Sequence, residues 1–226
     1  MTDALLLDYN GVIVDDEPLH CEAFLAVLGE EGIAVSPDAY WAEYLGLDDR
    51  ACFRKALYAD GRPIPPRDVA HLVARKGAYY RALARRSLPV VPGVGAFVRE
   101  AVNRRQVAVV SGATRQEIAL GLERAGIADA VSVIVTRDDV PTSKPDPAGL
   151  RLALARLAAA TPGPWRAAVA EDSLPGLGAA RALGAGCLVL TTAHPAAVLA
   201  GADLVWSSFE GHHPDELEPI FREVSA

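Results

Sequence analysis

The chain has 226 residues, which is enough for one large domain or for a core domain with a smaller insert. Its formal net charge of −7 at pH 7 argues against a general nucleic-acid binder, and none of its apolar runs approaches the roughly 18 residues of a membrane span. Because the first residues also lack the features of a signal peptide, we expect a cytoplasmic protein with neither nucleic-acid nor membrane partners. The three cysteines, Cys21, Cys52 and Cys187, have no metal-like spacing and are expected to be reduced and mostly buried.

Short apolar runs rich in Val, Leu and Ile recur along the chain, and helical stretches separate most of them. The runs are continuous rather than alternating, which is typical of strands covered on both faces in a parallel sheet. The resulting βαβ rhythm predicts an α/β fold. We expect strands at residues 4–8, 107–111, 131–136, 167–171, 186–190 and 203–206, with helices at 114–126, 147–160 and 174–184.

The stretch between the first two strands is far too long for a single crossover connection. Residues 17–87 carry helix signals and no convincing strand, and we expect them to form a helical insert. The chain returns through "SLPVVPGV", residues 87–94, whose prolines and glycine suit a hinge. The sequence therefore predicts a core domain of residues 1–16 and 88–226. The helices of the insert are expected at 18–32, 36–46, 48–60 and 67–86.

Four of the expected strands end in polar residues, namely Asp8, Ser111, the 136–144 loop with Lys144, and the pair Glu171 and Asp172. A single acid after a strand most often caps a helix. In an open parallel sheet, however, the C-terminal strand ends share one edge, where ligands bind. We therefore expect these four groups to converge on one site that faces the inserted helices.

Each group at this edge suits a role in phosphate chemistry. Asp8 can act as a nucleophile if a metal offsets its charge, and with Glu171 and Asp172 it supplies the hard oxygen ligands that Mg²⁺ prefers. The stretch "SGATRQE", 111–117, contains a capping box that fixes a helix N-terminus beside Ser111, where backbone N–H groups such as that of Gly112 bind phosphate. Lys144 precedes Pro145, which holds it on a stiff turn, and its compact ammonium can balance a carboxylate and a phosphoryl group together.

Motif by motif, the chain resembles the haloacid dehalogenase (HAD) superfamily, in the branch with a helical cap inserted after the first strand. Within that branch it is most similar to the β-phosphoglucomutase and phosphoglycolate-phosphatase-like group. The resemblance covers essentially the whole chain, with the motifs in the correct order and spacing. It rests on "LLLDYNGVIVDDEPLH", "VVSGAT", "SKPDP" and "AEDSLPGLGAARALG".

This resemblance implies a Rossmann-like core in which Asp8 is the nucleophile and forms an aspartyl-phosphate. It further implies that Ser111 and Lys144 hold the phosphoryl group. Asp172, helped by Glu171, would bind Mg²⁺, and the backbone carbonyl at position 10 would complete the ligand set. Residues 17–87 would form the cap that closes over the substrate.

Asn10 departs from the family pattern, which usually has a second Asp two residues after the nucleophile as general acid and base. Its amide can form hydrogen bonds but has no proton to transfer near neutral pH. Three explanations are open, namely a natural variant with changed chemistry, a non-catalytic relative, or a substitution made for crystallography. We expect a Mg²⁺-dependent hydrolase of a small phosphorylated metabolite, with weakened acid–base catalysis.

Alternatives to a phosphatase fit parts of this pattern. A sugar phosphomutase of the β-phosphoglucomutase type depends most on the acid–base residue, so Asn10 disfavours it. A dehalogenase of this superfamily uses no metal, which the pair Glu171 and Asp172 argues against. A phosphonatase places a Schiff-base lysine on the cap after a glycine turn, and residues 46–50 contain none. A phosphometabolite-binding protein without catalysis would not require Asp8.

The substrate would be selected by side chains of the inserted helices that face the core. By position, the candidates are Asp16, Glu17, His20, Asp49 and Arg50. Ordinary solvated helix ends explain these residues equally well. The acids among them disfavour very highly charged substrates.

Overall fold

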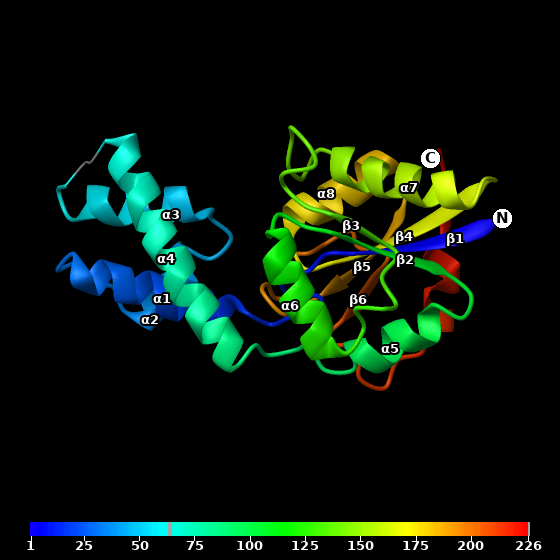
Figure 1. The fold of residues 1–226 in the computed structure, drawn as a ribbon, viewed down its shortest axis with the longest axis horizontal. Coiled ribbons are helices and arrows are strands. Elements are labelled where there is room, and N and C mark those ends of the chain that lie inside the picture. Colours follow the sequence, from blue (N-terminus) through cyan, green and yellow to red (C-terminus); the bar gives the residue numbers. More distant parts are fainter. Residues whose placement is uncertain (63–64, 226) are drawn as a thin grey trace. The chain divides into compact units, whose positions relative to one another are not determined.

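The computed structural model describes residues 1–62 and 65–225, and the chain forms two compact units (Figure 1). Unit 1 consists of Met1–Asp15 and the chain from Pro89 onward, and unit 2 consists of Asp16–Leu88. The boundaries expected for the insert, 17 and 87, lie one residue inside those of unit 2. The outgoing and returning segments are paired within unit 1, because the N–H of Asp15 donates to the carbonyl of Pro89 at 3.0 Å.

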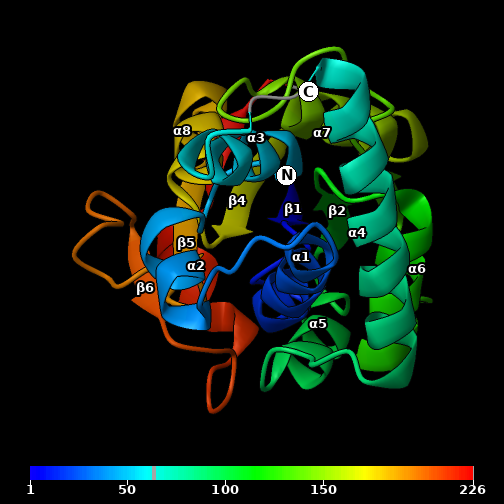
Figure 2. The same cartoon turned by 90° about the vertical axis from the view of Figure 1, so that its left-hand side faces the viewer.

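Unit 1 is built around a sheet in which six strands run parallel, so the predicted parallel sheet is confirmed. Each predicted strand is present, with ends within two residues of those expected. Because β1 lies between β2 and β4, the strand order reverses beside it, and ligands bind at such a switch point. The order, which can be followed in Figure 2 from β2 to β6, is β3 (Val133–Val135), β2 (Gln106–Val110), β1 (Thr2–Leu7), β4 (Trp165–Glu171), β5 (Gly186–Leu190) and β6 (Leu204–Trp206).

Helices cover both faces of this sheet, with α7 and α8 on one side and α5 and α6 on the other (Figure 1). Ala4 and Leu6 of β1 belong to the apolar core under α7 and α8. Leu5 and Leu7 alternate with them and are also buried. The strand is thus covered on both faces, which explains its continuous apolar run. The helices are α5 (Val94–Ala101), α6 (Arg115–Ala125), α7 (Ala148–Ala160) and α8 (Leu174–Leu183).

Unit 2 consists of four helices, as the sequence predicts, and its described residues contain no strand. Ser36 and Asp48 each accept a hydrogen bond from a backbone N–H in the first turn of the next helix, which fixes two of the helix starts. The second helix ends three residues earlier than expected, before Gly46. The helices are α1 (Glu17–Glu30), α2 (Pro37–Glu43), α3 (Asp49–Ala59) and α4 (Pro66–Arg86).

Phe24 forms the centre of the apolar core of unit 2. Its ring centroid lies 5.7 Å from that of Tyr40, 5.2 Å from that of Tyr44 and 5.0 Å from that of Phe53, all in tilted arrangements that aromatic pairs favour. Among the described residues, no helix has the length and apolarity needed to cross a bilayer. The three cysteines are free and buried, and burial raises the pKa of Cys52 and Cys187 to about 12.

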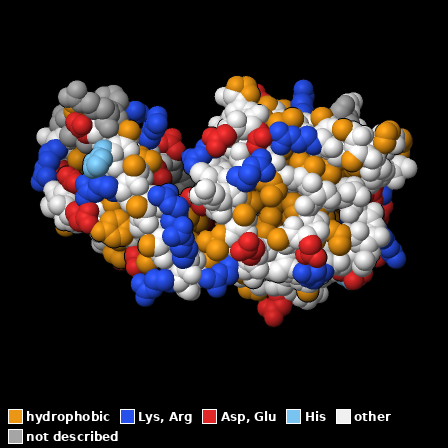
Figure 3. Space-filling view, in the orientation of Figure 1, with side chains coloured by type: hydrophobic (Ala, Val, Ile, Leu, Met, Phe, Trp, Pro, Cys, Tyr) orange, Lys and Arg blue, Asp and Glu red, His pale blue; other side chains and the backbone are white. Residues whose placement is uncertain are grey.

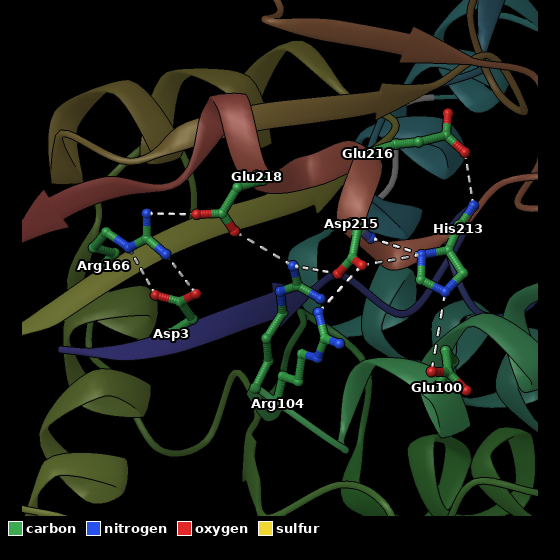
Figure 4. Close-up of polar contacts among 9 residues, drawn as sticks. Asp3, Glu100, Arg104, Arg166, His213, Asp215, Glu216 and Glu218 are labelled. Carbon is green, nitrogen blue, oxygen red and sulfur yellow. Dashed lines mark hydrogen bonds and ion pairs between the residues drawn. The ribbon is translucent and has the colours of Figure 1, made fainter.

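The last two elements, the 3-10 helix η1 (Pro214–Ile220) and β7 (Arg222–Val224), do not follow from the sequence patterns above, and neither does α5. β7 runs antiparallel to the first half of β4. Ion pairs of charged side chains hold η1 and β7 against the sheet (Figure 4). Arg166 forms a two-pronged ion pair with Asp3, with both contacts at 2.8 Å, and reaches Glu218 at 2.8 Å. The guanidinium groups of Arg166 and Arg105 both lie over the ring of Phe221.

Asp139 organises the loop that follows β3, where basic and acidic side chains gather on the surface (Figure 3). Its carboxylate accepts hydrogen bonds from the N–H and the hydroxyl of Thr136, both at 2.8 Å. It also pairs with Arg156 at 2.7 Å and with Arg115 at 3.3 Å. The hydrogen bonds from Arg156 and Thr136 hold the pKa of the Asp139 carboxyl well below its usual range. The ionised form of Asp139 therefore stabilises the folded state.

We predict that Asp139→Asn lowers the free energy of unfolding at pH 7 by about 1 kcal/mol, because it weakens hydrogen bonds to a charged acceptor. An unfolded Asp has a pKa of about 3.9. Since the folded pKa is lower, the stabilisation is complete above that pH and is lost as the pH falls through the folded value. The difference between variant and parent should therefore shrink below about pH 4.

Urea unfolding followed by circular dichroism from pH 7 to pH 3 measures this difference. Asp138→Asn is the matched control, because Asp138 is exposed and forms no ion pair or hydrogen bond with the part of the chain that the structure describes. Equal stabilities for the two variants at pH 7 would show that Asp139 does not hold the loop.

Candidate active site

The centre of the site is the end of β1, where Asp8 follows the last strand residue. Its N–H donates to the carbonyl of Ala170 on β4 at 2.9 Å, so the backbone of Asp8 is still held in the sheet. The chain then turns at Gly11, which has φ +69°. A Cβ at this position would lie 1.9 Å from Oδ2 of Asp172. Glycine is thus required by the turn and by the carboxylate packed against it.

Three carboxylates meet at the ends of β1 and β4. Ligand oxygens of Asp8, Glu171 and Asp172 all lie within 4.8 Å of one another, and Glu171 is completely buried. Oε2 of Glu171 accepts a hydrogen bond from the hydroxyl of Ser173 at 3.0 Å. The carboxylate rests against the first turn of α8, where a Cβ on Gly176 would lie 1.8 Å from its Cδ. The predicted convergence of the two strand ends is therefore seen.

Lys144 supplies the positive charge at this cluster. Its Nζ lies 2.9 Å from Oδ1 of Asp8 and also forms an ion pair with Oε1 of Glu171. Burial alone would lower the pKa of Lys144, but the negative charges of Asp8 and Glu171 outweigh that effect and raise it. The lysine is therefore protonated, and its ammonium pairs with two of the three clustered carboxyl groups.

The donor set fits a hard divalent cation. Although Oδ1 of Asp8 is buried and close to Lys144, it receives no hydrogen bond of good geometry from any described residue. Burial raises the pKa of Glu171, and the Lys144 ammonium offsets part of this increase. A second positive charge beside these oxygens would favour the ionised form of all three acids. Carboxylate oxygens without a full set of donors suit Mg²⁺.

Ser111 and Gly112 follow the neighbouring strand β2, at the same edge of the sheet. The N–H of Ser111 donates to the carbonyl of Val135 at 3.0 Å, and its hydroxyl accepts from the N–H of Ala113 at 3.2 Å. The predicted capping box is present at the start of α6 between Thr114 and Glu117. Gly112 has open space where a side chain would be. This loop can therefore present backbone N–H groups to an anion.

In unit 2, three of the five substrate-contact candidates, Asp16, His20 and Asp49, belong to one polar cluster. His20 stacks on Tyr80 with ring centroids 4.3 Å apart, and its Nε2 lies 3.3 Å from Oδ2 of the buried Asp16. Its Nδ1 contacts the ammonium of Lys76, which pairs with Asp49 at 2.7 Å. His20 and Asp49 therefore lie close together although they are far apart in sequence.

The other two candidates have different surroundings. Glu17 accepts a hydrogen bond from the hydroxyl of Tyr40. Arg50 is exposed and makes no ion pair or hydrogen bond with the described part of the chain. The pattern of helix ends missed Lys76, which is 3% exposed and is one of only three lysines in the sequence. The small number of lysines was the one feature of the sequence that could have drawn attention to Lys76. The pattern also missed Thr192, whose hydroxyl donates to the carbonyl of Gly11 at 2.7 Å and holds the turn after β1.

Comparison with known proteins bears on the chemistry of this site. A protein-family model described as "haloacid dehalogenase-like hydrolase" matches residues 2–184. Protein CbbY of Cereibacter sphaeroides is 30% identical over 225 residues, which cover 92% of this chain and 93% of that protein. The phosphoglycolate phosphatase of Yersinia pseudotuberculosis is 29% identical and covers 88% of this chain and 89% of its own length.

A solved structure of a CbbY protein has the same fold as this chain. CbbY from Rhodobacter sphaeroides, as an Asp-to-Asn variant in complex with xylulose-(1,5)bisphosphate, superposes with a TM-score of 0.73 at 27% identity. The superposition covers 93% of this chain and 96% of that one. The family model spans more than half of the sequence and includes every motif on which the resemblance rests. The chain therefore belongs to the haloacid dehalogenase-like hydrolase family, and the predicted hydrolase class is confirmed.

Proposed function

We propose that the protein is a Mg²⁺-dependent phosphate-monoester hydrolase that acts on a small phosphorylated metabolite through an aspartyl-phosphate at Asp8. The observation that carries this proposal is the meeting of Asp8, Lys144, Glu171 and Asp172 at one sheet edge. A nucleophile, a cation and two further acids are thereby brought together. Relatives that align over most of their length are phosphatases by name, which supports phosphate rather than halide as the group removed.

In the first step, a carboxylate oxygen of Asp8 attacks phosphorus. The new O–P bond forms as the ester P–O bond breaks, and the leaving oxygen takes the electron pair. Lys144 and the N–H groups after Ser111 offset the negative charge of the phosphoryl oxygens. Asp8, Glu171, Asp172 and the backbone carbonyl of Asn10 would hold Mg²⁺, which when bound neutralises charge on the phosphoryl group.

In the second step, water attacks the phosphorus of the aspartyl-phosphate and restores the Asp8 carboxylate. Both steps need a proton to move, and Asn10 stands where the family usually has the acid that moves it. Its amide cannot protonate the leaving group or deprotonate the attacking water. The reaction should therefore favour leaving groups of low pKa, such as phenols, and the second step should be slow.

Unit 2 would act as the cap over this site, and Asp16, Glu17, His20, Asp49 and Arg50 remain the candidates for its contacts with substrate. A cap that excludes water protects a reactive phosphoryl intermediate. The two segments that connect unit 1 with unit 2 are hydrogen-bonded to each other at Asp15 and Pro89. Two adjacent connections can serve as one hinge, which supports the proposal of a moving cap.

We predict that turnover requires Mg²⁺ and that Asp172→Asn weakens Mg²⁺ binding, because it removes a charged oxygen ligand. The loss should exceed the roughly 10–100-fold that is typical for the loss of an outer-shell partner. Calorimetric titration with Mg²⁺ and turnover in the presence of a chelator measure the two effects. Asp129→Asn, at an exposed acid with one ion pair at 3.3 Å, is the control. Chelator-resistant activity that releases halide would instead favour the dehalogenase chemistry.

We also predict that the parent protein releases phenol from an aryl phosphate in a fast burst followed by slow turnover, with phosphate trapped on Asp8. Asn10→Asp should abolish the burst and raise alkyl-phosphate turnover by about 10²–10⁴-fold, since it restores general acid–base catalysis. Stopped-flow absorbance and a phosphate assay measure the two phases.

The only other asparagine, Asn103, is exposed, and Asn103→Asp provides a control with the same change of charge. If Asn10→Asp leaves both the burst and the alkyl-phosphate rate unchanged, another group supplies the proton and position 10 has no acid–base role.

A further inference from the structure

A pocket of about 280 Å³ adjoins the phosphate-binding side of the site and lies entirely within unit 1. Its volume equals that of roughly nine water molecules in the liquid. It lies between the ends of β2 and β3, the loop that follows β3, and the start of α7. Much of its wall is apolar, with contributions from Val110, Val135, Val140 and Leu150. A pocket of this size with partly apolar walls can hold a hydrocarbon group of a ligand.

The same pocket is continuous with the residues expected to hold phosphate. Ser111, Gly112 and Lys144 line it, whereas none of the three clustered acids does. A molecule whose phosphoryl group contacts Ser111 and Lys144 therefore has the pocket beside it. The apolar walls would then contact the part of that molecule that does not react.

The rim of the pocket carries an arginine without a partner. Arg137 lines the pocket, is exposed, and makes no hydrogen bond or ion pair with the residues that the structure describes. Two neighbouring arginines differ from it, because Arg115 and Arg156 are both paired with Asp139. A guanidinium offers two parallel donors to a carboxylate or a phosphate.

The one acid on the lining, Asp146, already accepts a hydrogen bond from the backbone. Oδ1 of Asp146 accepts a hydrogen bond from the N–H of Ala148 at 2.8 Å, at the start of α7. The helix α7 begins one residue later than expected, and its N-cap is Pro147. Asp146 keeps its negative charge and Lys144 is paired with Asp8 and Glu171, so among the residues that line the pocket Arg137 is the cation that no described acid pairs with.

We propose that this pocket receives the non-reacting, apolar part of the substrate and that Arg137 binds a second anionic group on it, a carboxylate or a phosphate. The inference rests on the proposed phosphatase function and narrows its substrate class to phosphate monoesters with an apolar body and a second acidic group. It also places part of the substrate selection in unit 1, in addition to the candidates of unit 2.

Calorimetric titration in the presence of Mg²⁺ with three non-hydrolysable probes tests this proposal without relying on turnover. The probes are methylphosphonate, benzylphosphonate and 4-carboxybenzylphosphonate. Benzylphosphonate should bind about tenfold more tightly than methylphosphonate, because its ring leaves water for an apolar wall. The added carboxylate should tighten binding by about a further tenfold, as expected for a charged hydrogen bond.

Arg137→Gln should remove the gain from the carboxylate and leave the affinity for benzylphosphonate within about twofold. Arg151→Gln is the matched control and should change neither, because Arg151 is an exposed arginine of α7 that does not line the pocket. Val140→Trp should fill the pocket and abolish the gain from the benzyl group, with methylphosphonate affinity as the test of an intact site.

The outcomes separate this inference from the function on which it rests. If methylphosphonate binds and the other two probes bind no more tightly, the pocket proposal is wrong and the phosphatase proposal stands. If none of the probes binds, the phosphoryl site itself is wrong. If Val140→Trp fails to fold, the effect of Arg137→Gln on the two benzyl probes still decides the matter, and a carboxylate gain that survives Arg137→Gln refutes the role of Arg137.

Discussion

The structure of unit 1 depends on keeping three carboxylates together at the ends of two central strands. Like charges at such distances in a buried site repel strongly, and burial adds the loss of hydration. Lys144 compensates only part of this charge. The strand order matters for the same reason, because β1 and β4 must be direct neighbours for Asp8 to reach Glu171 and Asp172. A further positive charge beside the three carboxylates would reduce this repulsion.

The same constraint explains why glycines flank the acids. Gly11 and Gly176 each lie where a Cβ would overlap a carboxylate, with calculated separations of 1.9 Å and 1.8 Å. The two glycines act differently, since Gly11 also adopts a positive φ whereas Gly176 lies in the regular first turn of α8. The carboxylates thus rest directly against backbone. Their positions are set by main-chain atoms, which move less than side chains.

The sequence predicted the parts of this site that are coded locally. Asp8, Ser111 and Asp172 follow apolar runs, so the strand pattern and the rule that parallel strands share an edge were enough to bring them together. The contact between Lys76 and His20 could not be predicted in this way, because it joins two helices across 56 positions of sequence. The same holds for η1 and β7. Both are too short for a clear hydrophobic pattern, and ion pairs among Arg166, Asp3 and Glu218 stabilise this segment.

Charged side chains also cover one edge of the sheet. β3 is an edge strand, and the carbonyl of its central residue, Ile134, accepts hydrogen bonds from Arg115 at 3.4 Å and Arg156 at 3.1 Å. Exposed edge strands can pair with other chains, and charged side chains over the edge oppose this. Asp139 holds both arginines in place. The charged cluster beside the pocket therefore also protects the sheet.

The pairing of β4 with two strands that are far apart in sequence has a consequence for the folding of the new chain. One edge of this strand is divided, with residues 168–171 beside β5 and residues 165–167 beside β7. β5 ends at Leu190 and β7 begins at Arg222, so β5 can pair with β4 before β7 does. In that state the sheet would have a short open edge at Trp165, Arg166 and Ala167, where a foreign strand could add. The charge of Arg166 disfavours such an addition, so the residue that later binds Asp3 and Glu218 also guards the growing chain.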